Sequence, residues 1–226
     1  MKALLLLGRR IILFVSILQV ISCSSLPVIK PAPQDATMNS KCGQPFFESP
    51  YRFVHKIEVA LPGGKTLTLL GITSLEPLER SVSSAITTVE GFLLFEARYD
   101  KELHVYRALP PFDKEHFAEQ TMADIRLIFL SPQGQPSNTG ELQDGAAICR
   151  YDGDDGKVID VIVHRDKTWE IRTYYRHALL RKISALLLRD RMPGILELTG
   201  FEAVRYSLRF TLLSAEPVVD DLDIKE

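Results

Sequence analysis

The chain has 226 residues, of which 46% are hydrophobic and 25% are charged. These values are ordinary for a soluble globular protein, and the length suits one domain with a proper core. The 27 basic residues nearly balance the 29 acidic ones, which leaves a formal net charge of -2. The composition therefore gives no electrostatic reason to expect nucleic acid as a partner.

The first 23 residues differ in composition from the rest of the chain. Positive charge comes from Lys2, Arg9 and Arg10, and an apolar run of eleven residues follows over 11–21. A stable membrane-spanning helix needs about 20 residues, so this run is too short to span a bilayer. It has the length of the apolar region of an export signal. We therefore expect residues 1–22 to be a signal peptide.

The apolar run ends in Val20-Ile21-Ser22-Cys23. This ending resembles the bacterial lipobox, in which a small residue precedes a cysteine that is acylated and becomes the mature N-terminus. The resemblance implies that Cys23 is a lipid anchor that carries palmitate or comparable acyl chains. Two or more such chains make attachment to a membrane durable. The alternative is an ordinary signal peptide in which Cys23 is incidental.

Residues 23–50 have the composition of a spacer, with five prolines and little periodic apolar pattern. Proline-rich segments stay extended, which suits a domain held away from a membrane surface. We therefore expect a lipidated cysteine and linker over 23–50, a folded domain over 51–215 and an acidic tail over 216–226.

From Tyr51 onward, apolar and polar residues alternate, which predicts half-buried strands. A Pro-Gly-Gly turn at 62–64 sends the chain back after the first of them. The hairpin order favours an antiparallel sheet with one face in water. The strands predicted in this half of the chain cover 51–61, 65–73, 81–89, 92–99 and 103–108.

A helix is predicted from Lys114 to Leu130, with Asp113 as its N-cap and Ser131-Pro132 at its end. A second, shorter helix is predicted over 179–187, where leucine and isoleucine recur at helical spacing. Further strands are predicted over 146–151, 158–164, 169–174, 195–199 and 204–213, of which the last two form a hairpin about Gly200.

This order of elements predicts an α+β fold with one strongly curved antiparallel sheet, a half-barrel of about ten strands, and one or two helices on its concave side. A flat two-sheet sandwich is the alternative. Either a ligand cavity or a filled core would suit the apolar residues expected on the concave side. These residues are Phe53, Ile57, Leu67, Leu69, Phe95, Tyr206, Leu208 and Phe210.

Motifs for catalysis and for metal binding are absent from the sequence. There is no phosphate-binding glycine-rich loop, no Gly-x-Ser-x-Gly and no His-Glu-x-x-His. The acidic stretch 152–156 does not have the ligand spacing of a calcium loop and instead predicts a hairpin turn. No nucleophile has a recognisable setting, so we expect no enzymatic activity, no cofactor and no metal.

Two cysteines, Cys42 and Cys149, remain once Cys23 carries lipid. In an oxidising compartment an even remainder suggests a disulfide, although Cys149 as a buried small hydrophobe and Cys42 as a free thiol would also fit. The C-terminal third is locally basic, which suits either a solvated outer face or contact with anionic lipid. Its basic residues are Arg172, Arg176, Arg181, Lys182, Arg205 and Arg209.

Three stretches together resemble one family, the uncharacterised LolB-like outer-membrane lipoproteins, which are relatives of the LolA and LolB lipoprotein carriers. The first is 87–100, with threonines, a glycine, an apolar strand and a Tyr-Asp turn. The second is 122–129, a helix that bears Asp124 and is followed by Pro132. The third is Glu197-Leu198 leading to 206–208. Residues 175–193 look like an insertion relative to the family pattern.

The resemblance implies a half-barrel plugged by helices, with an apolar cavity for acyl chains. It leads us to expect a periplasm-facing outer-membrane lipoprotein that binds or transfers an acyl chain, a lipoprotein or a similar apolar ligand. The alternative is a structural envelope protein that recruits a protein partner through a sheet edge or its arginine-rich face and has no ligand.

Overall fold

The computed structural model describes residues 26–218, except for 33–35, 61–63, 65, 115, 154, 190–191 and 203–204. The predicted signal peptide, Cys23 and most of the predicted acidic tail lie outside the described residues. Within the described part of the chain, no helix is both long enough and apolar enough to cross a membrane.

One antiparallel sheet contains the 13 strands of the described residues, in the order β1-β7-β8-β9-β10-β11-β12-β13-β2-β3-β4-β5-β6. The first six strands are β1 (Lys30–Pro31), β2 (Tyr51–Ala60), β3 (Thr66–Glu76), β4 (Ser81–Thr88), β5 (Leu93–Tyr99) and β6 (Leu103–Ala108). The others are β7 (Asn138–Glu141), β8 (Ala147–Asp152), β9 (Lys157–Val163), β10 (Trp169–Tyr175), β11 (Ala178–Arg189), β12 (Met192–Gly200) and β13 (Tyr206–Pro217).

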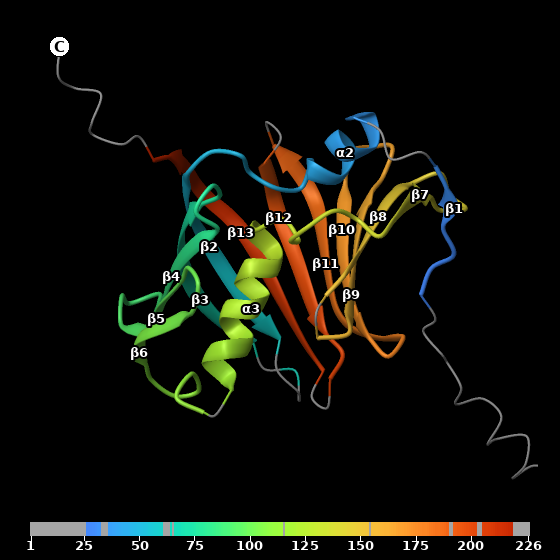
Figure 1. Ribbon diagram of the computed structural model, residues 1–226. Coiled ribbons are helices and arrows are strands. Elements are labelled where there is room, and N and C mark those ends of the chain that lie inside the picture. The colour runs from blue at the N-terminus through green and yellow to red at the C-terminus, as the bar shows by residue number, and fades with distance from the viewer. Residues whose placement is uncertain are drawn as a thin grey trace, which may run out of the picture.

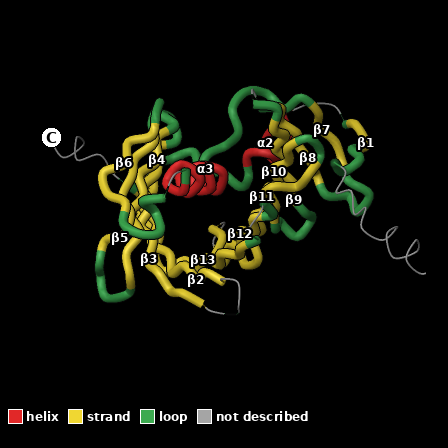
Figure 2. Tube along the Cα trace, turned by 90° about the horizontal axis from the view of Figure 1, so that it is seen from below, coloured by secondary structure: helices red, strands yellow, loops and turns green. Residues whose placement is uncertain are grey.

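The sheet is strongly curved and does not close (Figure 1; Figure 2). Helix α3 (Phe117–Phe129) lies within the curve, and helix α2 (Ala36–Gly43) lies near β8 and β10. We call the side of the sheet toward α3 the inner face and the opposite side the outer face. The structure confirms the predicted α+β half-barrel. It excludes the two-sheet sandwich, because β13 pairs directly with β2 and joins the two parts of the sheet.

Alternation along the strands places the core on the inner face. In β2, the side chains of Phe53, His55 and Ile57 are buried, whereas their neighbours are more exposed. Strand register extends this pattern sideways, because Ile57 lies opposite Leu69 on one side and opposite Phe210 on the other. The period of two in the sequence therefore predicted the correct face for this part of the sheet.

Helix α3 closes the core from the inner side. Its buried residues Met122, Ile125, Ile128 and Phe129 form one helical stripe. The helical spacing of the sequence predicts three of them but also Phe117, which is 39% exposed. The helix begins at Phe117 and not at Lys114, and its N-cap is His116 in place of Asp113.

The short helix predicted over 179–187 is wrong. These residues belong to strand β11, which pairs with both β10 and β12. β-Bulges between Ala185 and Leu187 and between Leu187 and Leu188 break the alternation along the strand. A bulge shifts the side-chain period by one residue, so the apolar pattern came to look helical. The stretch 175–193 contains strand β11, which lies between β10 and β12 in the sheet.

The predicted linker over 23–50 also needs correction, because part of it folds onto the sheet. Strand β1 pairs with β7, a strand that was not among those predicted from the sequence. Helix α2 packs Met38 and Cys42 against Ala147 and Cys149. The structure joins Cys42 to Cys149 as a disulfide with a Cα–Cα distance of 6.0 Å. The proline-rich segment thus contains a strand and a helix and is not extended over its whole length.

Candidate functional site

The upper end of the inner face, where β2 begins, is filled by helix α3. The ring of Phe53 is 2% exposed and stacks on Phe129 of α3 with a centroid distance of 5.2 Å. The side chains of Ile57, Leu69 and Phe210 belong to the same buried cluster. Phe95 is also buried in this cluster, where its ring stacks on Phe112. These five predicted lining residues therefore form packed core.

The lower end of the inner face, where β2 ends, is less completely covered. Val59 lies opposite Leu67 on β3 and opposite Leu208 on β13, and Leu208 lies opposite Leu198 on β12. Leu67 is 45% exposed, Val59 and Leu208 are half-buried, and Leu198 is fully buried. We call these four side chains the lower row. They form a continuous apolar strip across four strands that becomes progressively more open toward β3.

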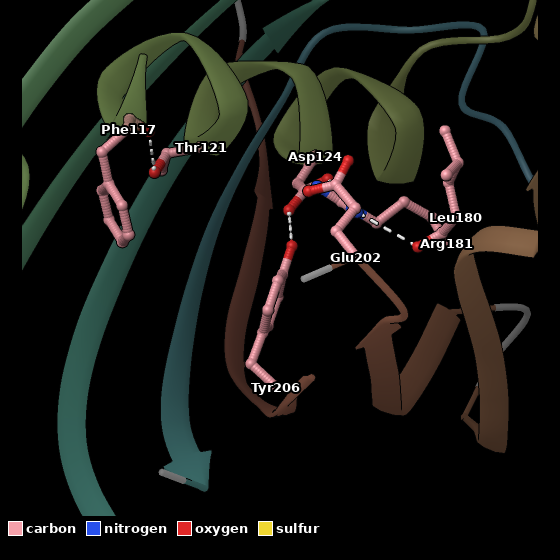
Figure 3. A network of polar contacts seen from close by, with 7 residues as sticks. All are labelled: Phe117, Thr121, Asp124, Leu180, Arg181, Glu202 and Tyr206. Carbon is pink, nitrogen blue, oxygen red and sulfur yellow. Dashed lines mark hydrogen bonds and ion pairs between the residues drawn. The ribbon is translucent and has the colours of Figure 1, made fainter. Parts of the chain in front are cut away.

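A polar cluster lies beside the lower row, where α3 meets β11 and β13 (Figure 3). The Nε of Arg181 donates to the Asp124 carboxylate at 2.9 Å, and the Tyr206 hydroxyl donates to the other Asp124 oxygen at 2.7 Å. A second guanidinium nitrogen of Arg181 donates to Glu202 at 3.2 Å. We call Asp124, Arg181, Glu202 and Tyr206 the inner polar cluster.

Sheet register explains how the inner polar cluster reaches the lower row. Arg181 and Tyr206 both lie opposite Gly200, on the two sides of β12. A Cβ atom on Gly200 would come within 2.4 Å of the Tyr206 ring. Glycine at this position therefore allows the Tyr206 ring to lie against β12 while its hydroxyl reaches Asp124 on α3. Tyr206 is the one predicted lining residue that is part of a polar network.

Burial and charge pairing act in opposite directions on the cluster. Burial raises the pKa of Asp124, while Arg181 and the Tyr206 hydroxyl favour the carboxylate form. Burial also raises the pKa of Tyr206, and the neighbouring Asp124 charge raises it further, so the phenol remains protonated. For Arg181 burial would lower the pKa, but Asp124 and Glu202 outweigh it and the net direction is upward. The cluster is thus one buried cation held between two carboxylates.

The basic residues predicted to form one C-terminal face are divided by the structure. Arg181 points to the inner face and is buried. Arg172 and Lys182 both pair with Glu170, at 2.6 Å and 3.0 Å. Arg209 pairs with Glu197 at 2.8 Å. Arg176 and Arg205 are exposed. The prediction of a single arginine-rich face is therefore wrong, and several of its cations are already neutralised by neighbouring carboxylates.

Sequence reasoning did not find the inner polar cluster, although one signal was present. Asp124 is half-buried on α3 and directly precedes the buried Ile125, so an unpaired carboxylate at this position would be costly. Its partners come from β11 and β13, which are 57 and 82 residues away in the chain. The resemblance included an aspartate-bearing helix but gave that aspartate no partner. Among the described residues, no group of three or more His, Cys, Asp or Glu is placed to hold a metal ion.

An open antiparallel half-barrel with a helix inside its curve is the fold of the LolA superfamily. The chain is similar to a LolA superfamily protein from Nitrosomonas europaea, with a TM-score of 0.57 and 9% identity over 84% of this chain and 96% of that one. At that identity the likeness establishes the fold alone.

Another similar structure is described as an outer membrane lipoprotein-sorting protein domain from Vibrio parahaemolyticus. It has a TM-score of 0.40 and 7% identity over 84% of this chain and 93% of that one. No protein-family model and no curated protein matches the sequence.

Proposed function

We propose that this chain is a periplasm-facing lipoprotein of the outer membrane whose half-barrel binds or transfers an acyl chain, a lipoprotein or a similar apolar ligand. The lower row carries the proposal, because it is an inward-facing apolar strip that helix α3 leaves partly uncovered. Leu67 is 45% exposed, although the sheet twist and register place it on the same face as buried Leu69.

An acyl chain suits this strip on energetic grounds. Each methylene group removed from water contributes about 0.8 kcal/mol, so a short apolar strip can select a flexible hydrocarbon chain. The inner polar cluster lies at one end of the strip, and the Glu202 carboxylate is its partly exposed member. A ligand with an apolar chain and a polar head that donates hydrogen bonds would therefore contact both parts of the site.

A single substitution distinguishes a ligand site from packed core. Leu208→Glu places a carboxylate in the lower row, where exposure lets water solvate it. We expect this variant to lose saturable binding of a fluorescent fatty-acid probe while it keeps its melting temperature within a few degrees. Ser207→Glu is the matched control, because residue 207 precedes Leu208 and points to the outer face. The control should bind the probe like the wild type.

The opposite outcome is equally clear. If the lower row is packed core, Leu208→Glu buries a charge at a cost of several kcal/mol and the domain unfolds. Global unfolding of Leu208→Glu, together with no probe binding by the wild type, would show that the ligand proposal is wrong.

The membrane attachment in this proposal depends on Cys23. The positively charged start, the apolar run and the small residue before Cys23 motivate it. Cys23→Ser should release the processed protein into the soluble periplasmic fraction or leave the precursor unprocessed. Membrane pelleting of a fully processed Cys23→Ser protein would contradict the anchor. Because binding in the half-barrel needs no chemical step, we also propose that the chain is not an enzyme.

A structural role in the envelope is the second candidate, and strand β6 supports it. β6 pairs with β5 only, at the end of the sheet, and its Tyr106 is 65% exposed. An exposed edge strand can pair with a strand of another protein. Tyr106→Lys should then abolish co-purification of a specific partner without affecting probe binding.

A further inference from the structure

Residues 26–32, which we call the strap, first run over the outer face of β8 and β9 and then pair with β7 as strand β1 at the edge of the sheet. Ile29 packs against Ala146, Ile148 and Ile162. Because Ile148 and Ile162 face away from Cys149 and helix α2, this cluster lies on the outer face. The folded body therefore begins within a few residues of the predicted anchor, and not at Tyr51.

Hydrogen bonds fix both ends of the strap. Near its start, an Arg150 guanidinium nitrogen donates to the Pro27 carbonyl at 3.2 Å. At its end, the Ala32 amide donates to the Thr139 carbonyl at 3.1 Å, and the Thr139 hydroxyl donates to the Ala32 carbonyl at 3.1 Å. The strap is thus bound at both ends to strands in the body of the sheet.

Gly140 on β7 shows that the sheet is shaped to receive the strap. A Cβ atom at this position would lie 2.1 Å from the Lys30 carbonyl oxygen and 2.7 Å from the Ile29 side chain. Any other residue would push the strap away from β7. The strap therefore contacts the sheet through a site that only glycine leaves open.

The chain length between anchor and strap limits where the membrane can be. Leu26 follows Cys23 by three residues, and an extended chain spans at most about 3.6 Å per residue. Three residues reach about 11 Å, which is short compared with a half-barrel of 13 strands. We infer that the bilayer surface faces the outer side of the β7–β9 edge and that the β6 edge is held far from it. This inference rests on the proposed acylation of Cys23.

Arg150 contributes no free positive charge to this surface. Arg150 makes a bidentate pair with Asp160, with both nitrogen–oxygen distances at 2.7 Å, and Asp160 is fully buried. The guanidinium nearest the start of the strap is therefore not available to a lipid phosphate. The same orientation is expected on vesicles of phosphatidylcholine alone and in high salt, because the tether length sets it.

Fluorescence quenching by lipids tests the orientation in the full mature protein. A fluorophore would be attached at Asn138→Cys, which is exposed on β7, or at Tyr106→Cys on the opposite edge strand, with the Cys42–Cys149 disulfide left intact. The protein would be reconstituted in phosphatidylcholine vesicles that contain headgroup-labelled quencher lipid. We expect the label at 138 to be quenched several-fold more strongly than the label at 106.

A matched control lengthens the tether without altering the body. About 30 Gly/Ser residues inserted between Ser25 and Leu26 have a root-mean-square span of about 30 Å, and they should make quenching at the two positions equal. Equal quenching at the two positions in the protein without the insertion would overturn the orientation, because it would mean that the strap detaches from the sheet. If Cys23 is not acylated, the intact mass lacks acyl chains and the protein does not bind vesicles. That result would overturn the proposed anchor and the orientation together, before any quenching is measured.

Discussion

Helices α2 and α3 are held to the same sheet in different ways. Helix α3 has 13 residues and buries four apolar side chains, and its Asp124 is paired with Arg181 and Tyr206. Helix α2 has eight residues, and of its described side chains Met38 and Cys42 belong to a small buried cluster. The disulfide from Cys42 to Cys149 ties α2 to β8.

A helix that buries little apolar surface can be held to the sheet by a covalent bond, whereas a helix that buries more needs only non-covalent contacts. Helices shorter than about 12 residues are marginal in water, so α2 depends on its attachment to the sheet. Two buried side chains give it little apolar area, and the disulfide compensates by reducing the entropy of the unfolded chain. α3 has enough apolar surface to need no such link, and its buried ion pair fixes the position along the sheet at which it docks.

The largest expected effect concerns the disulfide at α2. Replacing both Cys42 and Cys149 with Ser should lower the free energy of unfolding by about 3–5 kcal/mol, because the closed loop spans 107 residues. Urea unfolding of the mature domain, with and without reductant, measures this. The oxidised wild type should show no reactive thiol after denaturation. Two reactive thiols in unreduced, denatured protein that lacks residues 1–23 would show that the bridge does not form.

The next effect tests the packing of α3. Met122→Ala should lower the free energy of unfolding by about 3.5 kcal/mol, because Met122 is 1% exposed and its removal leaves a cavity. Ala123→Ser on the exposed side of the same turn is the control and should change stability by about 0.5 kcal/mol or less. Equal effects of the two substitutions would mean that α3 is not packed on the sheet as described.

Acid should weaken the packing between the sheet and helix α3. Burial lowers the pKa of His55 to about 4, and its ring lies 5.9 Å from that of Phe129 on α3. As the pH falls, His55 therefore binds a proton in the unfolded state before it does so in the folded state. The contribution of His55 to the free energy of unfolding is complete above about pH 6.5 and decreases as the pH drops toward 4. The loss at pH 4 should be about 3 kcal/mol.

The control for this pH dependence is His55→Phe, which keeps an aromatic ring among Phe53, Phe129 and Phe210. Comparing denaturant unfolding of both proteins between pH 7 and pH 4 isolates the histidine, because every other titrating group is shared. A variant with the same pH slope as the wild type would remove His55 as the cause.

The smallest expected effect concerns the hydrogen bond between the sheet and α3. Tyr206→Phe removes the donor to the Asp124 carboxylate and should cost about 2 kcal/mol, the usual size for a hydrogen bond to a charged group. A double-mutant cycle with Asp124→Asn measures the coupling between the two side chains. Strict additivity of the two changes would mean that the hydrogen bond contributes nothing in solution.

Local patterns in the sequence were sufficient for some elements and not for others. β2 and α3 follow undisturbed periods of two and 3.6, so both were predicted with the correct buried face. β11 contains two bulges, which turned its alternation into an apparent helical pattern. α2 was missed because its stability comes from the disulfide and from contacts with β8, neither of which leaves an apolar period in its own sequence.

The candidate site shows a similar division. Alternation placed Leu67 and Leu208 on the inner face, but exposure depends on how much of that face α3 covers, which no local pattern determines. The pairing of Asp124 with Arg181 depends on the order of strands across the sheet. Such long-range register cannot be predicted from a single sequence, whereas a charged residue beside an apolar helical stripe can be recognised in it.

The Cys42–Cys149 disulfide also has a mechanical consequence. A force transmitted through the proposed lipid anchor at Cys23 would first peel the strap from the sheet and then unwind α2. The peeling must stop at Cys42, because the covalent link transfers the load to Cys149 on β8. From Leu26 to Cys42 only 16 residues can be drawn out (42 − 26), about 55 Å of extended chain. The tether therefore has a short extensible part with a fixed limit, beyond which the half-barrel itself bears the force.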